Sequence, residues 1–242
     1  MKHHRSLLVV ILALTAALPH SMSAQANSPQ LTVLLKQLDA ASERFVNARA
    51  DFRWDYYERV VHDTSTQNGS IYFERNGTSI NMGAIVLNPN SASKSKIDKV
   101  IQYKAATLQM FDPGIDQITV LQAGANQAQY EGFLTLGFGG RGSDLDHAWH
   151  IKDLGPEKLS DDGQPVMTEK LDLTSRNTDG NSMFTHITIW VDPTRAISLK
   201  QEFYTASGDY RTAYYSHIKV NGNINKGAFA IKKDRNTTVV NH

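Results

Sequence analysis

The chain has 242 residues with 25 basic and 24 acidic side chains, so its formal net charge at pH 7 is only +1. This balance gives no electrostatic reason to expect nucleic acid or an anionic membrane surface as a partner. The absence of cysteine excludes disulfide bonds, and it excludes a lipoprotein signal because that signal acylates a cysteine.

The N-terminus has the composition of an export signal. Lys2 and Arg5 precede an apolar run, Leu7 to Leu18, and small residues after it end in Ala24-Gln25-Ala26. Signal peptidase accepts this A-x-A pattern, so we expect cleavage after Ala24 or Ala26. The run is about a dozen residues, shorter than the roughly 20 that a membrane-spanning helix needs. The alternative is a short anchor that stays uncleaved.

Removal of residues 1–26 takes away two basic residues and no acidic one, which changes the net charge from +1 to −1. The rest of the chain, residues 27–242, is expected to form a single soluble domain outside the cytoplasm. Without disulfide bonds its stability has to come from the core alone, and a chain of roughly 200 residues buries enough surface for that.

The first element expected after the signal is an amphipathic helix. Asn27 or Ser28 is a suitable N-cap, and Pro29 fits the first turn. Apolar residues then recur at helical spacing and form one stripe: Leu31, Leu34, Leu35, Leu38, Ala41 and Phe45.

From Asp51 onward the period changes to two. Phe52, Trp54 and Tyr56 alternate with other side chains, which is typical of a half-buried strand. Asn68-Gly69 and Asn76-Gly77 are both predicted to be turns, and Ser70–Arg75 with Ser79–Val86 is predicted to be a hairpin.

Further short strands fill most of the remaining chain, interrupted by a short helix predicted within Gln127–Phe138. The expected strands are Val100–Tyr103, Thr107–Phe111, Gln117–Leu121, His147–Leu154, Gln164–Thr174, Phe184–Val191, Ala196–Tyr204, Tyr210–Asn221 and Phe229–Ile231. The fold class is therefore mainly β with α: an antiparallel curved sheet or open barrel with helices over its concave side. Such a shape often encloses an apolar cavity.

The order of these segments resembles the LolA-like family of outer-membrane lipoprotein carriers and lipoprotein-sorting proteins. The likeness rests on the first helix, the strand Gly69–Arg75, the strand and turn Leu108–Pro113, and Ile187-Thr188-Ile189-Trp190-Val191-Asp192. Asn76 follows the arginine where the family has proline, and an aromatic residue expected near Leu108 is missing. The chain therefore looks like a divergent member.

The resemblance implies an incomplete antiparallel β-barrel, covered by helices, that holds acyl chains in its interior. It implies a monomeric periplasmic chaperone that receives an acylated lipoprotein, or another lipid, from an inner-membrane exporter and delivers it to an outer-membrane acceptor. Neither a metal nor another cofactor takes part, and the protein is not expected to be an enzyme.

Candidate site residues follow from the alternation and from the resemblance. The cavity candidates are the apolar members of each alternating strand: Phe52, Trp54, Tyr56, Ile71, Phe73, Ile80, Met82, Leu108 and Met110. The lid candidates come from the two helices: Leu34, Leu38, Phe45, Phe133 and Leu136. The alternative for each of them is a place in an ordinary filled core.

Arg75 matches the family arginine that, by resemblance, hydrogen-bonds the lid backbone and holds the unloaded protein closed. Its planar head with five donors suits that role. The alternative is an exposed arginine in front of the Asn76-Gly77 turn.

A group formed by Asp144, Asp146, His147 and His150 has the residue types of a metal site. A strand starting at His147 would place His147 and His150 on opposite faces, which favours a solvated loop instead. Two rival functions remain open: a lipid-sensing regulatory protein, and an enzyme that modifies envelope lipid or glycan.

Overall fold

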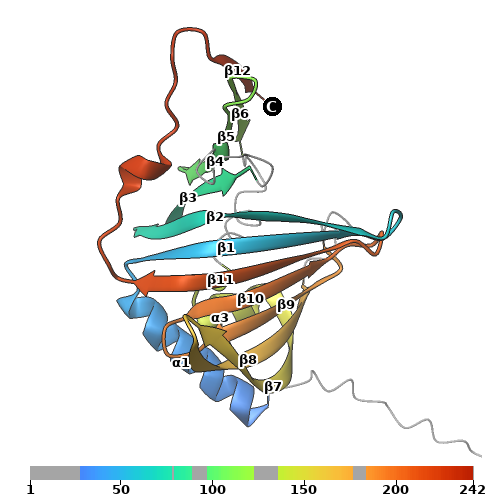
Figure 1. Ribbon diagram of the computed structural model, residues 1–242. Helices are drawn as coiled ribbons and strands as arrows, with labels where there is room; N and C mark the ends of the chain where they lie inside the picture. The colour runs from blue at the N-terminus through green and yellow to red at the C-terminus, as the bar shows by residue number, and fades with distance from the viewer. Residues whose placement is uncertain (1–27, 78, 89–96, 123–135, 177–183, 242) are drawn as a thin grey trace, which may run out of the picture.

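The computed structural model describes residues 28–77, 79–88, 97–122, 136–176 and 184–241. Within them one large curved sheet carries two α-helices against one part of its surface (Figure 1). The expected export signal, residues 1–26, lies outside the described residues. Both the signal and the single domain at 27–242 stay predictions.

Helix α1 (Pro29–Arg44) begins where the sequence predicts. The Ser28 hydroxyl accepts a hydrogen bond from the Leu31 backbone N–H at 3.1 Å, and Pro29 occupies the first helical position, where its missing N–H is no loss. The apolar stripe is buried and packs on Leu171 and Ile189 of the sheet. A second helix, α3 (Gly142–Ala148), lies beside α1, where the Ser143 N–H donates to Asp39 Oδ1 at 3.0 Å.

Among the described residues, twelve strands form one sheet. They are β1 (Asn47–Glu58), β2 (Asp63–Asn76), β3 (Ser79–Leu87), β4 (Ile97–Lys104), β5 (Thr107–Asp112), β6 (Gln117–Gln122), β7 (Trp149–Asp161), β8 (Gln164–Ser175), β9 (His186–Asp192), β10 (Ile197–Tyr204), β11 (Tyr210–Val220) and β12 (Thr238–Asn241).

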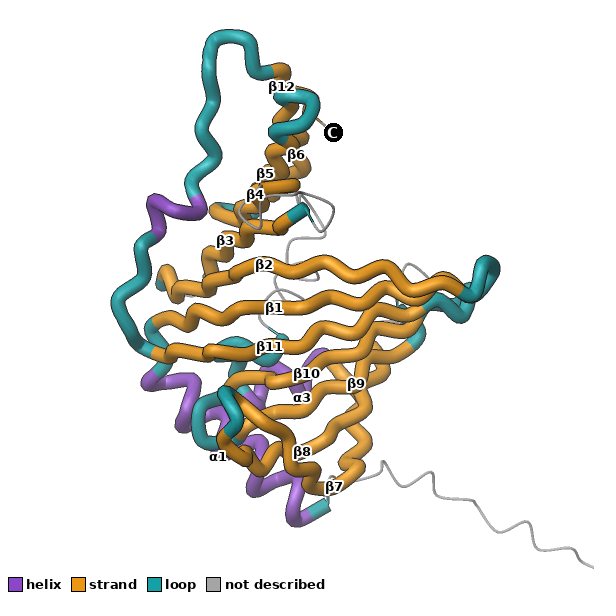
Figure 2. Tube along the Cα trace, in the orientation of Figure 1, coloured by secondary structure: helices purple, strands orange, loops and turns teal. Residues whose placement is uncertain are grey.

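The strand order is β12-β6-β5-β4-β3-β2-β1-β11-β10-β9-β8-β7. All neighbours are antiparallel except β12 and β6, which are parallel. The edge strands β7 and β12 do not pair with each other, so the sheet is open. Figure 2 shows that it is also curved. This confirms the mainly β class and the antiparallel meander, and most of the predicted strands are present.

Asn68-Gly69 is not a turn, contrary to the prediction. Both residues lie inside β2, where Gly69 pairs with Phe52 of β1 and with Val86 of β3. A Cβ atom at Gly69 would overlap the Ile85 carbonyl oxygen and would lie 2.6 Å from Phe52 Cζ. Glycine is present here because the neighbouring strand and the Phe52 ring leave no room for a side chain.

Two further predictions of the sequence were wrong. Phe229–Ile231 is not a strand: Lys226–Phe229 forms a short 3₁₀ helix, η2, from which Phe229 packs edge-on against Tyr72 at 4.8 Å. The strand expected from His147 begins at Trp149, because α3 takes the residues before it. Of the helix predicted within Gln127–Phe138, residues 127–135 lie outside the described residues.

The buried apolar residues of the described ranges form two clusters. One lies between α1 and strands β8 and β9 and includes Trp149. The other lies over β1, β2, β3 and β11 and includes Phe52, Phe73 and Tyr215. Neither helix among the described residues is long and apolar enough to cross a lipid bilayer.

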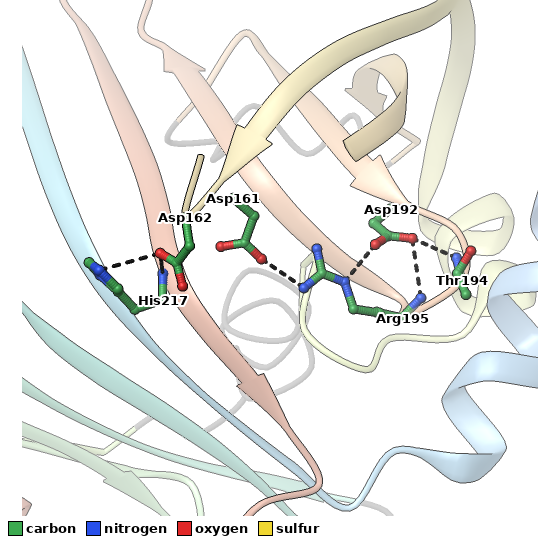
Figure 3. A network of polar contacts seen from close by, with 6 residues as sticks. All are labelled: Asp161, Asp162, Asp192, Thr194, Arg195 and His217. Carbon is green, nitrogen blue, oxygen red and sulfur yellow. Dashed lines mark hydrogen bonds and ion pairs between the residues drawn. The ribbon is translucent and has the colours of Figure 1, made fainter. Parts of the chain in front are cut away.

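The β7–β8 hairpin bends over toward β11. Its bend is at Gly155, which has a φ of +86°, beside a register shift between Asp153 and Pro156. At its tip Asp162 accepts a hydrogen bond from the His217 N–H of β11 at 3.0 Å. These contacts hold the hairpin tip beside β11 (Figure 3).

Arg195 links this tip to the β9–β10 turn. Its Nη1 lies 2.8 Å from Asp161 Oδ2, and its Nε lies 2.6 Å from Asp192 Oδ2 (Figure 3). Both carboxylate side chains are nearly buried, with 10% and 8% of their surface exposed. Burial alone would lower the pKa of Arg195, but the hydrogen bonds to the two carboxylates outweigh it and raise that pKa. The arginine therefore neutralises two carboxylates that have little access to water.

Replacing Arg195 with Met is expected to destabilise the protein by about 3 kcal/mol, because two nearly buried carboxylates lose their partner. The matched control is Arg49→Met, which removes an exposed ion pair to Asp51 at 3.8 Å and should cost no more than about 0.5 kcal/mol. Urea unfolding monitored by circular dichroism measures both. Equal effects of the two substitutions would contradict this account of the network.

Gly69→Ala is expected to destabilise the protein by about 2 kcal/mol, because the new methyl group overlaps a backbone carbonyl that cannot move independently. Gly222→Ala is the control, since no atom lies within 4 Å of a Cβ there. The free energy of unfolding of the control should stay within about 0.5 kcal/mol of wild type. A neutral Gly69→Ala variant would show that β2 and β3 are not packed as described.

Candidate functional site

An apolar groove lies on the face of the sheet that carries Trp54, termed the inner face. The register places Trp54, Ala213, Gln201, Ile189 and Leu171 in one row across β1, β11, β10, β9 and β8. Because α1 packs on Leu171 and Ile189, the helix covers the inner face over β8 and β9. The groove, with a cavity volume of about 180 Å³, begins where the helix cover ends.

The groove is built by the two-residue alternation of the strands. Ile71 of β2 lies opposite Ala84 of β3, which lies opposite Ile101 of β4. Phe73 lies opposite Met82 in the next row. Small side chains at Ala84 and Ala213 leave space between larger neighbours, so the alternation yields a hollow as well as a packed surface.

Four of the nine predicted cavity residues line this groove: Trp54, Ile71, Phe73 and Met82. Phe52 is buried and stacks on Trp54 with ring centroids 4.1 Å apart, so it supports the wall. Ile80 is buried in the apolar cluster over β1, β2, β3 and β11, and Leu108 packs against that cluster. Tyr56 and Met110 share the inner face but lie beyond the groove lining.

Nine further residues line the groove and were missed as site candidates; seven of them lie on strands, and Phe138 and Phe184 lie outside the strands. They are Ala84, Ile101, Phe138, Phe184, Gln201, Phe203, Arg211, Ala213 and Tyr215. Gln201 with Phe203, and Arg211 with Ala213 and Tyr215, follow the same two-residue period as Phe52 and Trp54. That period was visible in the sequence, but which later strands pair beside β1 was not.

The predicted lid residues separate into two groups. Leu136 lines the groove, and it also lines a second hollow of about 90 Å³ together with Leu38. Leu34 packs in the helix-covered cluster, away from the groove, and Phe45 packs in the cluster below the groove. Phe133 lies outside the described residues.

A short segment, residues 136–140, covers the groove and is termed the covering loop. Its Phe138 stacks on Phe73 at 4.1 Å and meets Tyr215 edge-on at 4.8 Å. The loop is fixed to the sheet by two backbone hydrogen bonds, from Gly139 N to Ala196 O at 2.9 Å and from Ser198 N to Gly137 O at 2.6 Å. The Phe138 side chain of the loop therefore forms part of the groove wall.

Arg75 connects the covering loop to the end of α1. Its Nη2 donates to Gly139 O at 2.7 Å and to Ser42 Oγ at 3.0 Å, and its Nε donates to Phe45 O at 3.2 Å. Ser42 Oγ donates in turn to Gly139 O at 2.7 Å. Arg75 thus lies half-buried between helix, loop and sheet, in contact with the backbone of both covering elements.

The floor of the groove contains a small polar pair. The Tyr215 hydroxyl donates to Gln201 Oε1 at 3.2 Å, and the Gln201 amide donates to the Leu136 carbonyl. Burial strongly raises the pKa of Tyr215, so its phenol stays neutral. The pair satisfies its own hydrogen bonds and ties the covering loop to β10 and β11.

Two members of the group Asp144, Asp146, His147 and His150 contact a cation of the protein itself, Arg176. Arg176 Nη2 lies 3.6 Å from Asp146 Oδ1, and Arg176 Nη1 lies 3.2 Å from His150 Nδ1. Three of the four residues belong to α3, not to the expected loop. Within the described ranges, no group of three or more His, Asp or Glu side chains is arranged to hold a metal ion.

The fold and the groove define a class of protein: a mainly β protein whose open curved sheet is partly covered by helices and presents an apolar groove. No protein-family model matches the chain, and no curated protein matches it.

Solved structures similar to the chain include an uncharacterized conserved protein from Thermus thermophilus, at 12% identity and a TM-score of 0.51, covering 88% of this chain and 99% of that chain. They also include an outer-membrane lipoprotein-sorting protein domain, so described, from Vibrio parahaemolyticus (12% identity, TM-score 0.43, 81% and 94% covered). A third is a LolA superfamily protein from Nitrosomonas europaea, at 15% identity and a TM-score of 0.37, covering 83% of this chain and 97% of that chain. The likeness to the Thermus protein shows a shared fold.

Proposed function

We propose that the protein is an extracytoplasmic carrier that binds the acyl chains of lipoproteins, or of another lipid, in the apolar groove. By the family resemblance it would work in the periplasm, receive its cargo from an inner-membrane exporter and pass it to an outer-membrane acceptor. In this proposal the open sheet acts as an incomplete barrel whose inner face holds the chain.

The main support for the carrier proposal is the apolar groove. Its walls are aromatic and aliphatic, from Trp54, Ile71 and Phe73 on one side to Phe184 and Phe203 on the other. Burying each methylene contributes about 0.8 kcal/mol, so even a few methylenes supply useful affinity. Met82 adds a flexible, polarizable side chain that adapts to ligands of irregular shape.

Release is the second requirement of a carrier, and the covering loop supports it. Phe138 occupies part of the groove wall through contacts with Phe73 and Tyr215. An acyl chain that enters further into the groove would have to displace Phe138 from this contact and break the hydrogen bonds from Arg75 to the covering loop. Closure of the loop then favours release, which is the latch role proposed for Arg75.

The direct test is native mass spectrometry of the protein purified from the envelope fraction of its own cells. We expect adducts with the mass of a lipid or of an acylated protein, removed by delipidation and restored by added lipid. Absence of any adduct, together with no binding of a fluorescent fatty acid, would reject the carrier proposal.

Ala213→Leu is expected to weaken acyl-chain binding about tenfold, because the added side chain occupies the space of about two methylenes of ligand. Ala213 lies opposite Trp54 and lines the groove. Ala228→Leu on the exposed surface of η2 is the control and should bind as wild type. Titration with a fluorescent fatty acid measures both, and equal affinities would place the ligand elsewhere.

Arg75→Leu is expected to slow transfer of bound lipid to acceptor vesicles about tenfold, because the charged hydrogen bonds that close the covering loop are lost. Arg49→Leu, which removes one exposed ion pair, is the control. Stopped-flow transfer of a fluorescent lipid measures the rate. An unchanged rate in Arg75→Leu would reject the latch while leaving the carrier proposal intact.

A further inference from the structure

Among the described residues, Arg211 is the only charged side chain that lines the groove, and the other lining residues are apolar or neutral. Arg211 of β11 lies opposite Tyr56 of β1 and opposite Phe203 of β10. Its guanidinium carbon lies 5.5 Å from the centre of the Tyr56 ring and 6.0 Å from that of Trp54. The arginine therefore lies against aromatic rings at the margin of the groove, and it remains exposed to solvent.

No carboxylate in the described part of the chain forms an ion pair with Arg211. The nearby acids of neighbouring strands, Asp55 and Glu202, lie at outer-face positions and pair there with Arg53 and Lys200. Glu58 is on the inner face of β1, one alternation beyond Tyr56, and forms no ion pair with Arg211 either.

Asp209, which precedes β11 in the turn after β10, is engaged elsewhere. It accepts hydrogen bonds from the Arg59 backbone N–H at 2.8 Å and from the Ser207 hydroxyl at 2.6 Å. Tyr204 Oη donates to Glu202 at 2.6 Å, which adds a second partner to that acid. Arg211 thus keeps its donors available, apart from its contacts with the aromatic rings.

A guanidinium has a planar set of donors that matches a carboxylate or a phosphate in a bidentate arrangement. Aromatic rings beneath it hold the guanidinium in place without using its N–H donors. With an apolar groove on one side and solvent on the other, such a cation suits a molecule with a long apolar tail and an anionic head.

We propose that Arg211 is the head-group site of the groove and that the ligand is an anionic amphiphile whose acyl chain lies along Trp54 and Phe203. This rests on the proposed function, because it assumes that the groove takes an acyl chain. Carboxylate and phosphate share the required chemistry, as the head of a fatty acid or of a phospholipid.

The test compares three single-chain ligands with the same tail: dodecanoate, dodecyl phosphate and dodecanol. Each displaces the neutral fluorescent probe N-phenyl-1-naphthylamine from the purified protein, which gives its dissociation constant. The variants are Arg211→Gln, which removes the charge, and Arg211→Lys, which keeps the charge without the planar fork. Arg53→Gln is the matched control, since Arg53 stacks on Tyr214 at 4.3 Å on the outer face.

Arg211→Gln should weaken binding of one or both anionic ligands about tenfold and change dodecanol binding by less than about twofold. An effect on only one anion identifies the head group as carboxylate or as phosphate. Arg211→Lys should restore part of the loss, and Arg53→Gln should bind all three ligands as wild type does. Thermal unfolding by circular dichroism checks that every variant is folded.

Two results would overturn the head-group site while leaving the carrier proposal in place: anion binding that Arg211→Gln does not change, or an equal loss for all three ligands. Failure of every ligand to displace the probe from the wild-type protein would reject both proposals together.

Discussion

The apolar inner face of the open sheet has to be shielded from water by other parts of the chain. The remaining features of this protein depend on how that face is covered. Helix α1 has 16 residues, so it is only about 24 Å long. It lies over β8 and β9, where Leu171, Leu173, Ile187 and Ile189 receive its apolar stripe. The inner face of β1, β2, β3 and β11 lies outside that cover. The covering loop shields only part of this second area, and the groove lies in the remainder.

Arg75 connects these two forms of cover. It donates to carbonyls at the end of α1 and in the covering loop at once, so the position of the loop depends on that of the helix. Hydrogen bonds to a charged donor contribute more than neutral ones but remain exchangeable. A loop held by them, with one aromatic side chain packed into the groove, is better suited to repeated opening than a loop buried by a large apolar contact would be.

The polar residues of the inner and outer faces have separate roles. On the outer side, Arg195 forms ion pairs with the nearly buried Asp161 and Asp192 and links the β7–β8 hairpin tip to the β9–β10 turn. On the inner side, Tyr215 and Gln201 satisfy each other, whereas Arg211 pairs with no carboxylate of the described residues. The proposed head-group site depends on this exposed cation, which lies against the Trp54 and Tyr56 rings beside an apolar groove.

The sequence by itself determined the elements that depend on local chemistry. Ser28, Pro29 and the spacing of the leucines predict α1, and the alternation at Phe52 and Trp54 predicts a strand with one buried face, because capping and side-chain period are properties of neighbouring residues. Arg75 was singled out through the resemblance, and its role as a latch stays a prediction. Tertiary structure decided the rest. Asn68-Gly69 has the composition of a turn, yet packing against Phe52 and Ile85 places it inside β2. The groove includes Gln201, Arg211 and Tyr215 only because β11, with β10 beside it, pairs with β1 across more than 150 residues of chain. No local pattern in the sequence specifies which distant strands become neighbours.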